Sequence, residues 1–369
     1  MLTLKKIIFF TSSHKIGLTS LLAEQACSIH KYAKELFLFI SGEKEQFAGL
    51  FDKLDFHHVN YAKIIGLDEH KNIVELVDNF KKHVEQFNPD VVHVHTNWQL
   101  MIVVIVRYLC RNKYSIVYEL HGYRHNHRVR SIIARYLIGV GLYLFADKVI
   151  STSSFLKKKF DFLGKKNELL FYGVDENYFV QFDPVINNDK KRLIFPGEFR
   201  EGKNQELLIH VLKEYIDQTG DETVELYLPG KGERLEACKA LCKKLKVESR
   251  VIFPGFLNRD QMLCYYLMCQ FAVIPTNYET FGLCISEPYV LGRVVISRRV
   301  GVAEDIIVHG VNGFLFDTKG DLLELLVKIL PAGDKCGLVS KNAFKARDIF
   351  RWDNINQKYL ALVENIDRN

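Results

Sequence analysis

The chain has 369 residues, of which 48% are hydrophobic and 25% are charged, and its formal net charge is +6. This length predicts two domains, and the composition is that of a globular protein with enough apolar residues for two cores. The charge is compatible with an anionic small substrate or a membrane surface, but it is too small to indicate nucleic-acid binding.

Neither the cysteines nor the apolar runs indicate export or a membrane span. The eight cysteines include no CxxC pair, which favours reduced thiols over a zinc site. The N-terminal apolar run is too short for a signal peptide. The longest uncharged apolar stretch runs from Tyr136 to Ala146, whereas a spanning helix needs ~20 such residues. We therefore expect a cytoplasmic protein.

In the first half of the chain, short β-branched and aromatic runs alternate with helical patterns. Strands are expected at KKIIFF, ELFLFI, DVVHVH, SIVYEL, DKVIS and ELLFY. Residues 73–87 carry apolar side chains at helical spacing, which predicts an amphipathic helix. Residues 131–146 are apolar on nearly every face, so we expect a helix buried in the core. This alternation is typical of a parallel sheet with helices on both faces.

The pattern pauses at residues 181–191, whose sequence QFDPVINNDKK is typical of a linker. It restarts with strands expected at KRLIFPG, TVELYLPG, RVIFPG, QFAVIP and RVVIS, and with helices such as residues 233–245 and 341–366. We predict a first domain over residues 1–180, a second over 192–345, and a terminal helix over 346–369 that packs back toward the first domain. Two doubly wound, Rossmann-like domains of this kind would face each other across a cleft and bind ligands beyond the carboxyl ends of their strands.

The most informative segment is YETFGLCISEP, residues 278–288, which follows the strand FAVIP. Gly282 permits a close backbone approach, and the following helix start favours an anion such as a phosphate. Glu279 and Glu287 lie eight positions apart, or roughly 12 Å along a helix. Paired glycosidase carboxylates are closer, at ~5–9.5 Å, so binding is favoured over hydrolysis. A solvated glutamate and a capping glutamate remain the alternative.

Two further segments place glycines or cations between a strand and a helix. FPGEFREGKNQELL, residues 195–208, carries Arg200 and Lys203, and two cations at a helix start suit a diphosphate. In LPGKGERLEACK, Gly230 and Gly232 form only part of the dinucleotide pattern GxGxxG. A charged surface turn and a tight structural turn are the respective alternatives.

Two segments of the first half also follow strands. His121 ends the strand SIVYEL and is placed to hydrogen-bond a sugar hydroxyl, although a lone histidine is more often structural. Gly17 opens a helix whose N–H groups would face phosphates. His125 and His127 have no neighbouring carboxylate or thiol at ligand spacing, so we expect no metal site.

In this order, the motifs resemble the retaining glycosyltransferases of family 4, or glycosyl transferases group 1, which have the GT-B fold. In the first half the resemblance rests on PDVVHVH, ELHG, ADKVISTSSFLKKKF and YGVDENYF. In the second half it rests on PGEFREGKN, VIFPGF, GVNGFLF and the block containing Glu279 and Glu287. It covers nearly the whole chain. It implies a hexosyltransferase that uses a UDP- or GDP-sugar as substrate, needs no cofactor or metal, and retains the anomeric configuration by front-side attack.

The resemblance also implies a role for each matching residue. Arg200 and Lys203 would hold the donor diphosphate, Glu279 would position the donor sugar, and His121 would lie beside that sugar at the reaction centre. The donor-binding residues would be Gly17, Gly230, Gly232, Phe281, Gly282, Leu283, Glu287 as the ribose ligand, and Glu304. The sequence departs from the family pattern at Ile16, Tyr172, Glu198 and Thr280, positions that bear on the identity of the donor.

The acceptor side is expected in the basic segment after His121. Arg124, Arg128 and Arg130 would attract an anionic membrane surface or a lipid-linked acceptor, so we expect peripheral attachment to the inner face of the cell membrane. The resemblance suggests a role in bacterial surface polysaccharide synthesis, such as O-antigen, capsule or lipopolysaccharide. A nucleotide-sugar epimerase of the same fold and a non-catalytic nucleotide-sugar-binding protein are the alternatives. The incomplete glycine pattern makes a nicotinamide dehydrogenase a poor match.

Overall fold

The computed structural model describes residues 5–12, 24–42, 60–65, 73–110, 113–121, 129–180 and 191–366, without the side chains of residues 12, 62–65, 129–135 and 333–335. The chain divides into two compact units, which are described separately. The first comprises Met1–Gly173 together with Trp352–Asn369, and the second comprises Val174–Arg351. In the described part of the chain, no helix is both long enough and apolar enough to span a membrane.

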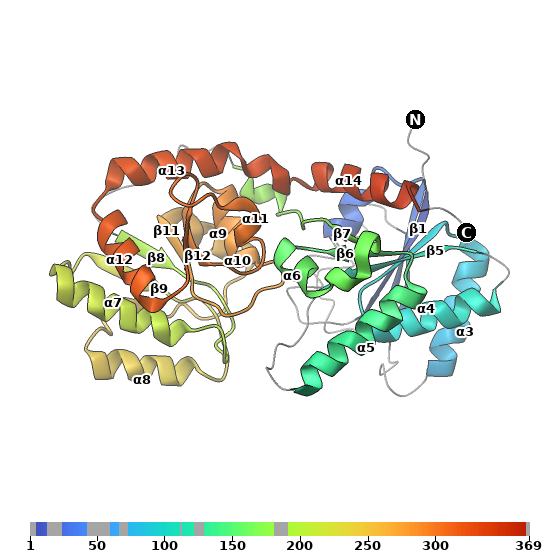
Figure 1. Cartoon of the computed structure of the whole chain (residues 1–369), viewed down its shortest axis with the longest axis horizontal. Coiled ribbons are helices and arrows are strands. Elements are labelled where there is room, and N and C mark those ends of the chain that lie inside the picture. The colour runs from blue at the N-terminus through green and yellow to red at the C-terminus, as the bar shows by residue number, and fades with distance from the viewer. Residues whose placement is uncertain are drawn as a thin grey trace. The chain divides into compact units, whose positions relative to one another are not determined.

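The first unit is built on a seven-stranded parallel sheet with strand order β3-β2-β1-β4-β5-β6-β7 (Figure 1). Its strands are β1 Lys6–Ser12, β2 Glu35–Gly42, β3 Asn60–Ile65, β4 Val91–Val94, β5 Ser115–Leu120, β6 Lys148–Ser151 and β7 Asn167–Leu169. Its helices are α3 Ile73–Phe87, α4 Asn97–Leu109, α5 Val129–Phe145, α6 Ser154–Lys159, the 3-10 segment η2 Asp161–Lys166, and α14 Trp352–Glu364.

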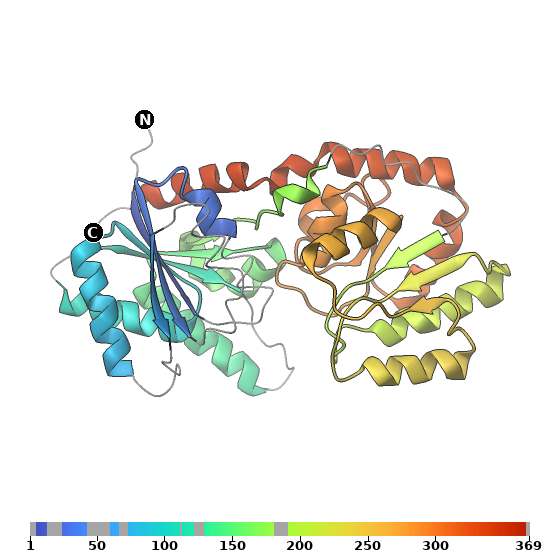
Figure 2. The same ribbon diagram turned by 180° about the vertical axis from the view of Figure 1, so that it is seen from behind.

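Alternation along β1 explains how both faces of this sheet are covered. Phe10 packs against Phe80 of α3 and Trp98 of α4, with ring centroids 5.0 and 5.4 Å apart. Phe9 points to the opposite face, where it stacks with Tyr359 of α14 at 6.1 Å. Successive side chains of a strand point to opposite faces, so one strand contributes to two cores. Figures 1 and 2 show α3, α4 and α5 as one layer on one side of the sheet.

The second unit has a six-stranded parallel sheet with strand order β10-β9-β8-β11-β12-β13. Its strands are β8 Lys191–Ile194, β9 Val224–Tyr227, β10 Val251–Ile252, β11 Phe271–Ile274, β12 Val294–Arg298 and β13 Phe314–Phe316. Its helices are η3 Glu176–Tyr178, α7 Gln205–Thr219, α8 Leu235–Leu245, α9 Arg259–Met268, α10 Leu283–Val290, α11 Ala303–Ile306, α12 Lys319–Ile329, α13 Gly333–Lys345 and η4 Arg347–Phe350.

Each sheet has a point where the strand order reverses. In the first unit the chain proceeds from β1 outward to β3 and then returns to β4, so the reversal lies between β1 and β4. In the second unit it lies between β8 and β11. Ligands of doubly wound folds bind beyond the carboxyl ends of the strands at such a point. The loops that follow β8 and β11 are therefore expected to form a ligand-binding site.

The predicted fold class is confirmed, and so is the helix over residues 73–87. Several boundaries were wrong. The helix expected over 341–366 is the end of α13, the 3-10 turn η4 and α14, because the backbone is extended at Arg351. The strand expected at ELLFY is limited to β7, and β3 and β13 were not predicted.

The boundary between the units also differs from the expected residue 180. Val174 N–H donates to the carbonyl of Phe350 at 2.9 Å, and Arg347 donates to the carbonyl of Val180 at the same distance. These bonds attach residues 174–180 to the second unit. The predicted linker, residues 181–191, lies outside the described residues except for Lys191, which begins β8.

Candidate functional site

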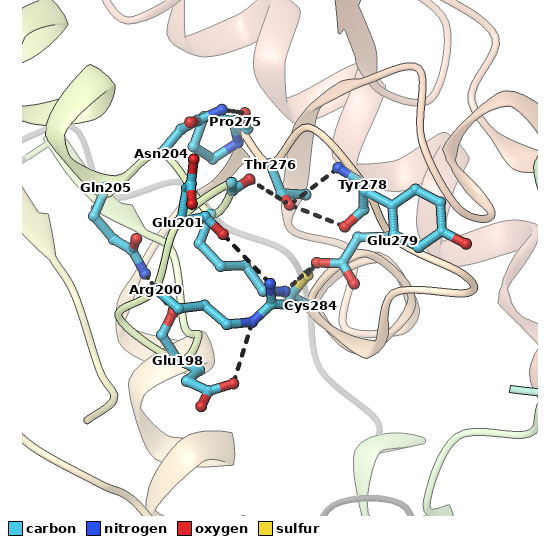
Figure 3. A network of polar contacts seen from close by, with 12 residues as sticks. Glu198, Arg200, Glu201, Asn204, Gln205, Pro275, Thr276, Tyr278, Glu279 and Cys284 are labelled. Carbon is cyan, nitrogen blue, oxygen red and sulfur yellow. Dashed lines mark hydrogen bonds and ion pairs between the residues drawn. The ribbon is translucent and has the colours of Figure 1, made fainter. Parts of the chain in front are cut away.

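Two loops meet at the strand-order reversal of the second unit (Figure 3). One loop, residues 195–204, connects β8 to α7, and the other, residues 275–282, connects β11 to α10. The side-chain amide of Asn204 donates to the carbonyl of Pro275 at 2.8 Å and to Asn277 at 2.7 Å, and Asn277 N–H donates to the carbonyl of Gly202 at 2.9 Å. These bonds fix the two loops to each other.

The two loops also place Lys203 in contact with Glu279. The Lys203 ammonium forms an ion pair with one carboxylate oxygen of Glu279, and both side chains are largely buried, at 12% and 15% exposed. The thiol of Cys284 lies 3.8 Å from the same oxygen. Burial lowers the pKa of Lys203, but the Glu279 carboxylate and the neighbouring Cys284 together raise it above its usual value, so the ammonium stays charged. The structure thus brings together two residues that the sequence places 76 positions apart.

Arg200 differs from Lys203 in its surroundings. Its side chain is 46% exposed, its Nε lies 3.2 Å from the Glu198 carboxylate, and its guanidinium donates to the carbonyl of Glu201 at 3.4 Å. An exposed ion pair of this kind contributes little to stability. The Arg200 side chain can therefore exchange these contacts for a bound anion at low cost.

Gly230 and Gly232 support the loop that carries these cations. Gly197 N–H donates to the carbonyl of Pro229 at 3.0 Å, and Phe199 N–H donates to the carbonyl of Lys231 at 2.9 Å. Both glycines have positive φ, of 147° and 149°, and a Cβ atom on Gly232 would lie 2.7 Å from the backbone nitrogen of Phe199. The two glycines therefore allow the backbone that follows β9 to lie directly against residues 197–199. The predicted contact of these glycines with the donor stays a prediction.

The start of α10 is defined by Gly282, whose φ of 94° precedes the first helical residue, Leu283. The ring of Phe281 is buried and packs edge-on to Phe350, with the ring centroids 6.0 Å apart. Only the backbone of Phe281 therefore contributes to the surface of the loop. Val302 N–H donates to the carbonyl of Phe281 at 2.8 Å and so joins the segment containing Glu304 to this loop. Glu304 itself is exposed on α11. The helix start and its first N–H groups form an anion-favouring position beside Lys203 and Glu279.

Glu287 lies farther along α10 and is partly buried. It accepts a hydrogen bond of 3.1 Å from the Tyr266 hydroxyl. Burial raises its pKa to about 7, against the lowering effects of the Tyr266 hydrogen bond and the Arg259 charge. A carboxyl with this pKa changes charge near neutral pH, which is a feature of ligand-binding and catalytic groups.

The first unit holds a separate cluster of polar side chains at the ends of β4 and β5. His121, just after β5, uses both ring nitrogens: Nδ1 lies 2.5 Å from the Tyr172 hydroxyl, and Nε2 lies 2.7 Å from Nδ1 of His95. His95 follows β4, the strand beside the reversal point of this sheet. From the sequence, Tyr172 was only a departure from the family pattern, whereas in the structure its hydroxyl contacts His121 directly.

Beneath His121 lies a buried carboxylate, Glu119, which sequence analysis missed. Glu119 is 1% exposed, and its two oxygens lie 3.1 Å from Nε2 of His93 and 3.7 Å from Nε2 of His121. Burial alone would raise its pKa, but the hydrogen bond with His93 and the nearby histidine charges hold that pKa well below its usual range. A usable signal was present, because the neighbouring strands β4 and β5 end in His-x-His and Glu-x-His and place these side chains on one face.

This cluster is relevant to the expected absence of a metal. Across the described ranges, only His93, His95 and Glu119 form a group that could hold a metal ion. His93 already contacts the Tyr359 hydroxyl at 2.9 Å through Nδ1 and the Glu119 carboxylate through Nε2. Hydrogen bonds can therefore hold these three side chains together in place of a metal ion. Metal independence stays a prediction.

Some predicted site residues lie outside the described part of the chain. These are Gly17, Arg124 and Arg128, and for Arg130 only the backbone, within α5, is described. For α5 itself, the expectation of a fully buried helix was wrong. Leu137 is 68% exposed and Leu144 is 61% exposed, because only one face of α5 packs against the sheet layer.

Two doubly wound parallel units, with cations and a helix start at a strand-order reversal, have the architecture of the GT-B class of glycosyltransferases. Comparison of the sequence with protein families agrees. The family described as Glycosyltransferase Family 4 matches residues 35–177, and the family described as Glycosyl transferases group 1 matches residues 178–346. The two matches together span residues 35–346, so the chain consists of a Glycosyltransferase Family 4 domain followed by a Glycosyl transferases group 1 domain and belongs to the GT-B glycosyltransferases with this pair of domains.

Individual relatives are distant. One uncharacterized glycosyltransferase of Methanocaldococcus jannaschii is 29% identical over 173 residues, a match that spans 46% of this chain and 44% of the relative. A second from the same organism is 23% identical over 311 residues, or 82% of this chain and 84% of the relative. Among solved structures, Anabaena HepE in complex with UDP and glucose has a TM-score of 0.79 at 19% identity, covering 97% of this chain and 99% of HepE. This last likeness concerns the fold.

Proposed function

We propose that the protein transfers a hexose from a UDP- or GDP-sugar to a glycan or lipid-linked acceptor, with retention of configuration and without a metal ion. The observation that carries the proposal is the junction of the two loops, which gathers Lys203, Arg200, Glu279 and the start of α10 at the reversal point between β8 and β11. The UDP and glucose bound to HepE support a UDP-sugar as the first donor to test. The family resemblance supports a role in bacterial surface polysaccharide synthesis.

In this proposal the second unit binds the donor. Lys203 and Arg200 offset the charge that develops on the leaving diphosphate, and the first N–H groups of α10 bind its oxygens. Glu279 accepts hydrogen bonds from hydroxyls of the donor sugar, and its ion pair with Lys203 keeps both groups oriented before the donor arrives. Glu287 accepts hydrogen bonds from the ribose. The backbone at Phe281, Gly282 and Leu283 completes the contact, and the family resemblance implies that Glu304 and Gly17 also bind the donor.

The family resemblance implies that His121 of the first unit hydrogen-bonds the donor sugar. Because Tyr172 and His95 occupy its two ring nitrogens, His121 must exchange one of these contacts to donate to a sugar hydroxyl. The buried carboxylate of Glu119 lies 3.7 Å from Nε2 of the same ring.

The chemical step is a single exchange at the anomeric carbon. The bond from that carbon to the diphosphate oxygen breaks as the acceptor oxygen attacks from the same face, and the acceptor proton passes to an oxygen of the leaving diphosphate. No protein nucleophile is required. The work of the protein is to position both substrates and to stabilise the charge of the leaving group.

The direct test has two stages. A thermal-shift screen of UDP- and GDP-sugars should identify a donor, because a ligand at 100 times its Kd adds about 2.7 kcal/mol of stability. Release of nucleoside diphosphate from that donor is then measured with and without glycan and lipid-linked acceptors. Acceptor-dependent release supports transfer, whereas fast release of nucleotide with inversion of a sugar hydroxyl in the product would support an epimerase. Binding without turnover would support a binding protein.

A further inference from the structure

The outer faces of two helices in the first unit carry exposed apolar side chains. On α5 these are Tyr136 51%, Leu137 68%, Val140 53%, Tyr143 56% and Leu144 61% exposed. On α4 they are Met101 46%, Ile105 37%, Tyr108 76% and Leu109 57% exposed. The spacing of three, four and seven places each set along one side of its helix. We call the two sets together the apolar face.

The two helices that carry the apolar face contact each other. The helices α4 and α5 are neighbours in the layer that covers one side of the sheet (Figure 1). The face extends beyond α5 through Phe162 of η2, which is 43% exposed and whose ring lies 5.6 Å from that of Tyr136. Gly139 permits this contact, because a Cβ atom there would overlap the Phe162 ring. Large contiguous apolar patches on a protein surface mark interaction sites.

Lysines border the apolar face. The segment of α6 and η2 contains Lys157, Lys158, Lys159, Lys165 and Lys166, with Asp161 as its one acidic residue. Lys166 shows how closely this segment adjoins α5: its ammonium donates to the carbonyl of Tyr143 at 2.7 Å and lies 5.2 Å from the centre of the Tyr143 ring. Lys158 and Lys165 are exposed.

We propose that the apolar face docks on the surface of an anionic membrane. Leucine, valine and methionine side chains would enter the boundary between headgroups and acyl chains, the tyrosines would lie at the headgroup level, and the lysines would pair with lipid phosphates. The surface has the composition of an interfacial helix pair: apolar residues on one face, aromatic residues with a polar tip, and cations at the rim. This inference extends the proposed use of a lipid-linked acceptor, because it identifies the part of the first unit that approaches the lipid.

A second copy of the chain is the other obvious occupant, and the charges disfavour it. In a two-fold symmetric dimer, the same patch is present on both sides of the interface. A dimer through this face would bring the lysine-rich rims of both copies into one interface, whereas anionic lipid offers the opposite charge. A dimer formed through the apolar face is one of the outcomes that the vesicle experiment distinguishes.

The test compares sedimentation of the full chain with vesicles of phosphatidylcholine alone and with vesicles containing phosphatidylglycerol. We expect binding to the anionic vesicles that weakens with added salt. The variant with Leu137→Gln, Val140→Gln and Leu144→Gln should bind at least about tenfold more weakly, because three aliphatic side chains would no longer enter the apolar layer. Lys158→Gln with Lys165→Gln should reduce binding only to the anionic vesicles.

The matched control replaces exposed apolar residues of the second unit, Phe256, Val308 and Val311, with glutamine and should leave vesicle binding unchanged. Donor binding by thermal shift is measured in every variant, so that loss of folding or failure of the proposed function is recognised separately. Unchanged vesicle binding in the α5 variant would overturn the inference, as would the absence of binding by the wild type. A wild-type dimer in solution that the α5 variant converts to a monomer, without vesicle binding, would assign the face to a second copy.

Discussion

Replacement of Gly232 by alanine tests how the loop of Arg200 and Lys203 is held in place. A Cβ atom on Gly232 would lie 2.7 Å from the nitrogen and 2.8 Å from the carbonyl carbon of Phe199, where ordinary contacts begin at 3.4 Å. The φ of 149° adds strain for any residue other than glycine. The two backbones must therefore separate by roughly 1 Å, which lengthens the 2.9 Å bond from Phe199 N–H to the carbonyl of Lys231.

The expected effects follow from this displacement. Backbone strain of this kind costs ~1–3 kcal/mol, so the melting temperature should fall. A shift of ~1 Å in groups that position a substrate can cost ~10²-fold in rate. We expect kcat to fall by about that factor, since Lys203 follows Phe199 in the same loop, and nucleotide affinity to fall with it.

The assay is nucleotide release under saturating donor, together with a melting curve for each variant. Gly220→Ala is the matched control, because Gly220 also has positive φ, at 68°, but a Cβ atom there meets nothing within 4 Å. Both variants should lose stability, and only Gly232→Ala should lose kcat. If kcat stays within twofold of wild type while the melting temperature falls, the glycine supports the fold but not the site.

Three further predictions concern charge. Affinity for a nucleotide sugar, whose diphosphate does not titrate in this range, should fall by up to tenfold per pH unit below pH 7, where Glu287 becomes protonated, and Glu287→Gln should abolish this dependence in a calorimetric titration. Glu119→Gln should lower the melting temperature most above pH 4.5 and less in acid, because a carboxyl whose pKa is lowered stabilises the fold only while ionised. Activity should persist in EDTA; inactivation that Mg²⁺ or Mn²⁺ reverses would contradict metal independence.

Local sequence patterns were sufficient to predict the fold class and many of the elements. The spacing of apolar residues over 73–87 matches α3, and the buried strands β4 and β5 follow from DVVHVH and SIVYEL. Such patterns reflect which side of an element is buried, and they are contained within a few residues. The same property explains the wrong expectation for α5, whose composition is apolar on nearly all sides although one side is exposed.

The contacts inside the sites could not be read in this way. The ion pair of Lys203 with Glu279 joins two loops that are adjacent only because β8 and β11 are neighbours in the sheet. Likewise, Tyr172, which follows β7 in the chain, contacts His121, and Glu119 of β5 contacts His93 of the neighbouring strand β4. These contacts depend on strand order, which periodicity within one element does not specify. Resemblance to the family drew attention to His121, Lys203 and Glu279, but not to the groups that surround them.

The central claim is that Lys203 and Arg200 bind the diphosphate of the donor. The most direct measurement is a calorimetric titration of wild type, Lys203→Met and Arg200→Met with a nucleoside diphosphate and with the corresponding monophosphate. We predict that the wild type binds the diphosphate more tightly, and that each substitution weakens diphosphate binding while changing monophosphate binding little. Equal affinity of the wild type for both nucleotides, or the same diphosphate affinity in all three proteins, would contradict the claim.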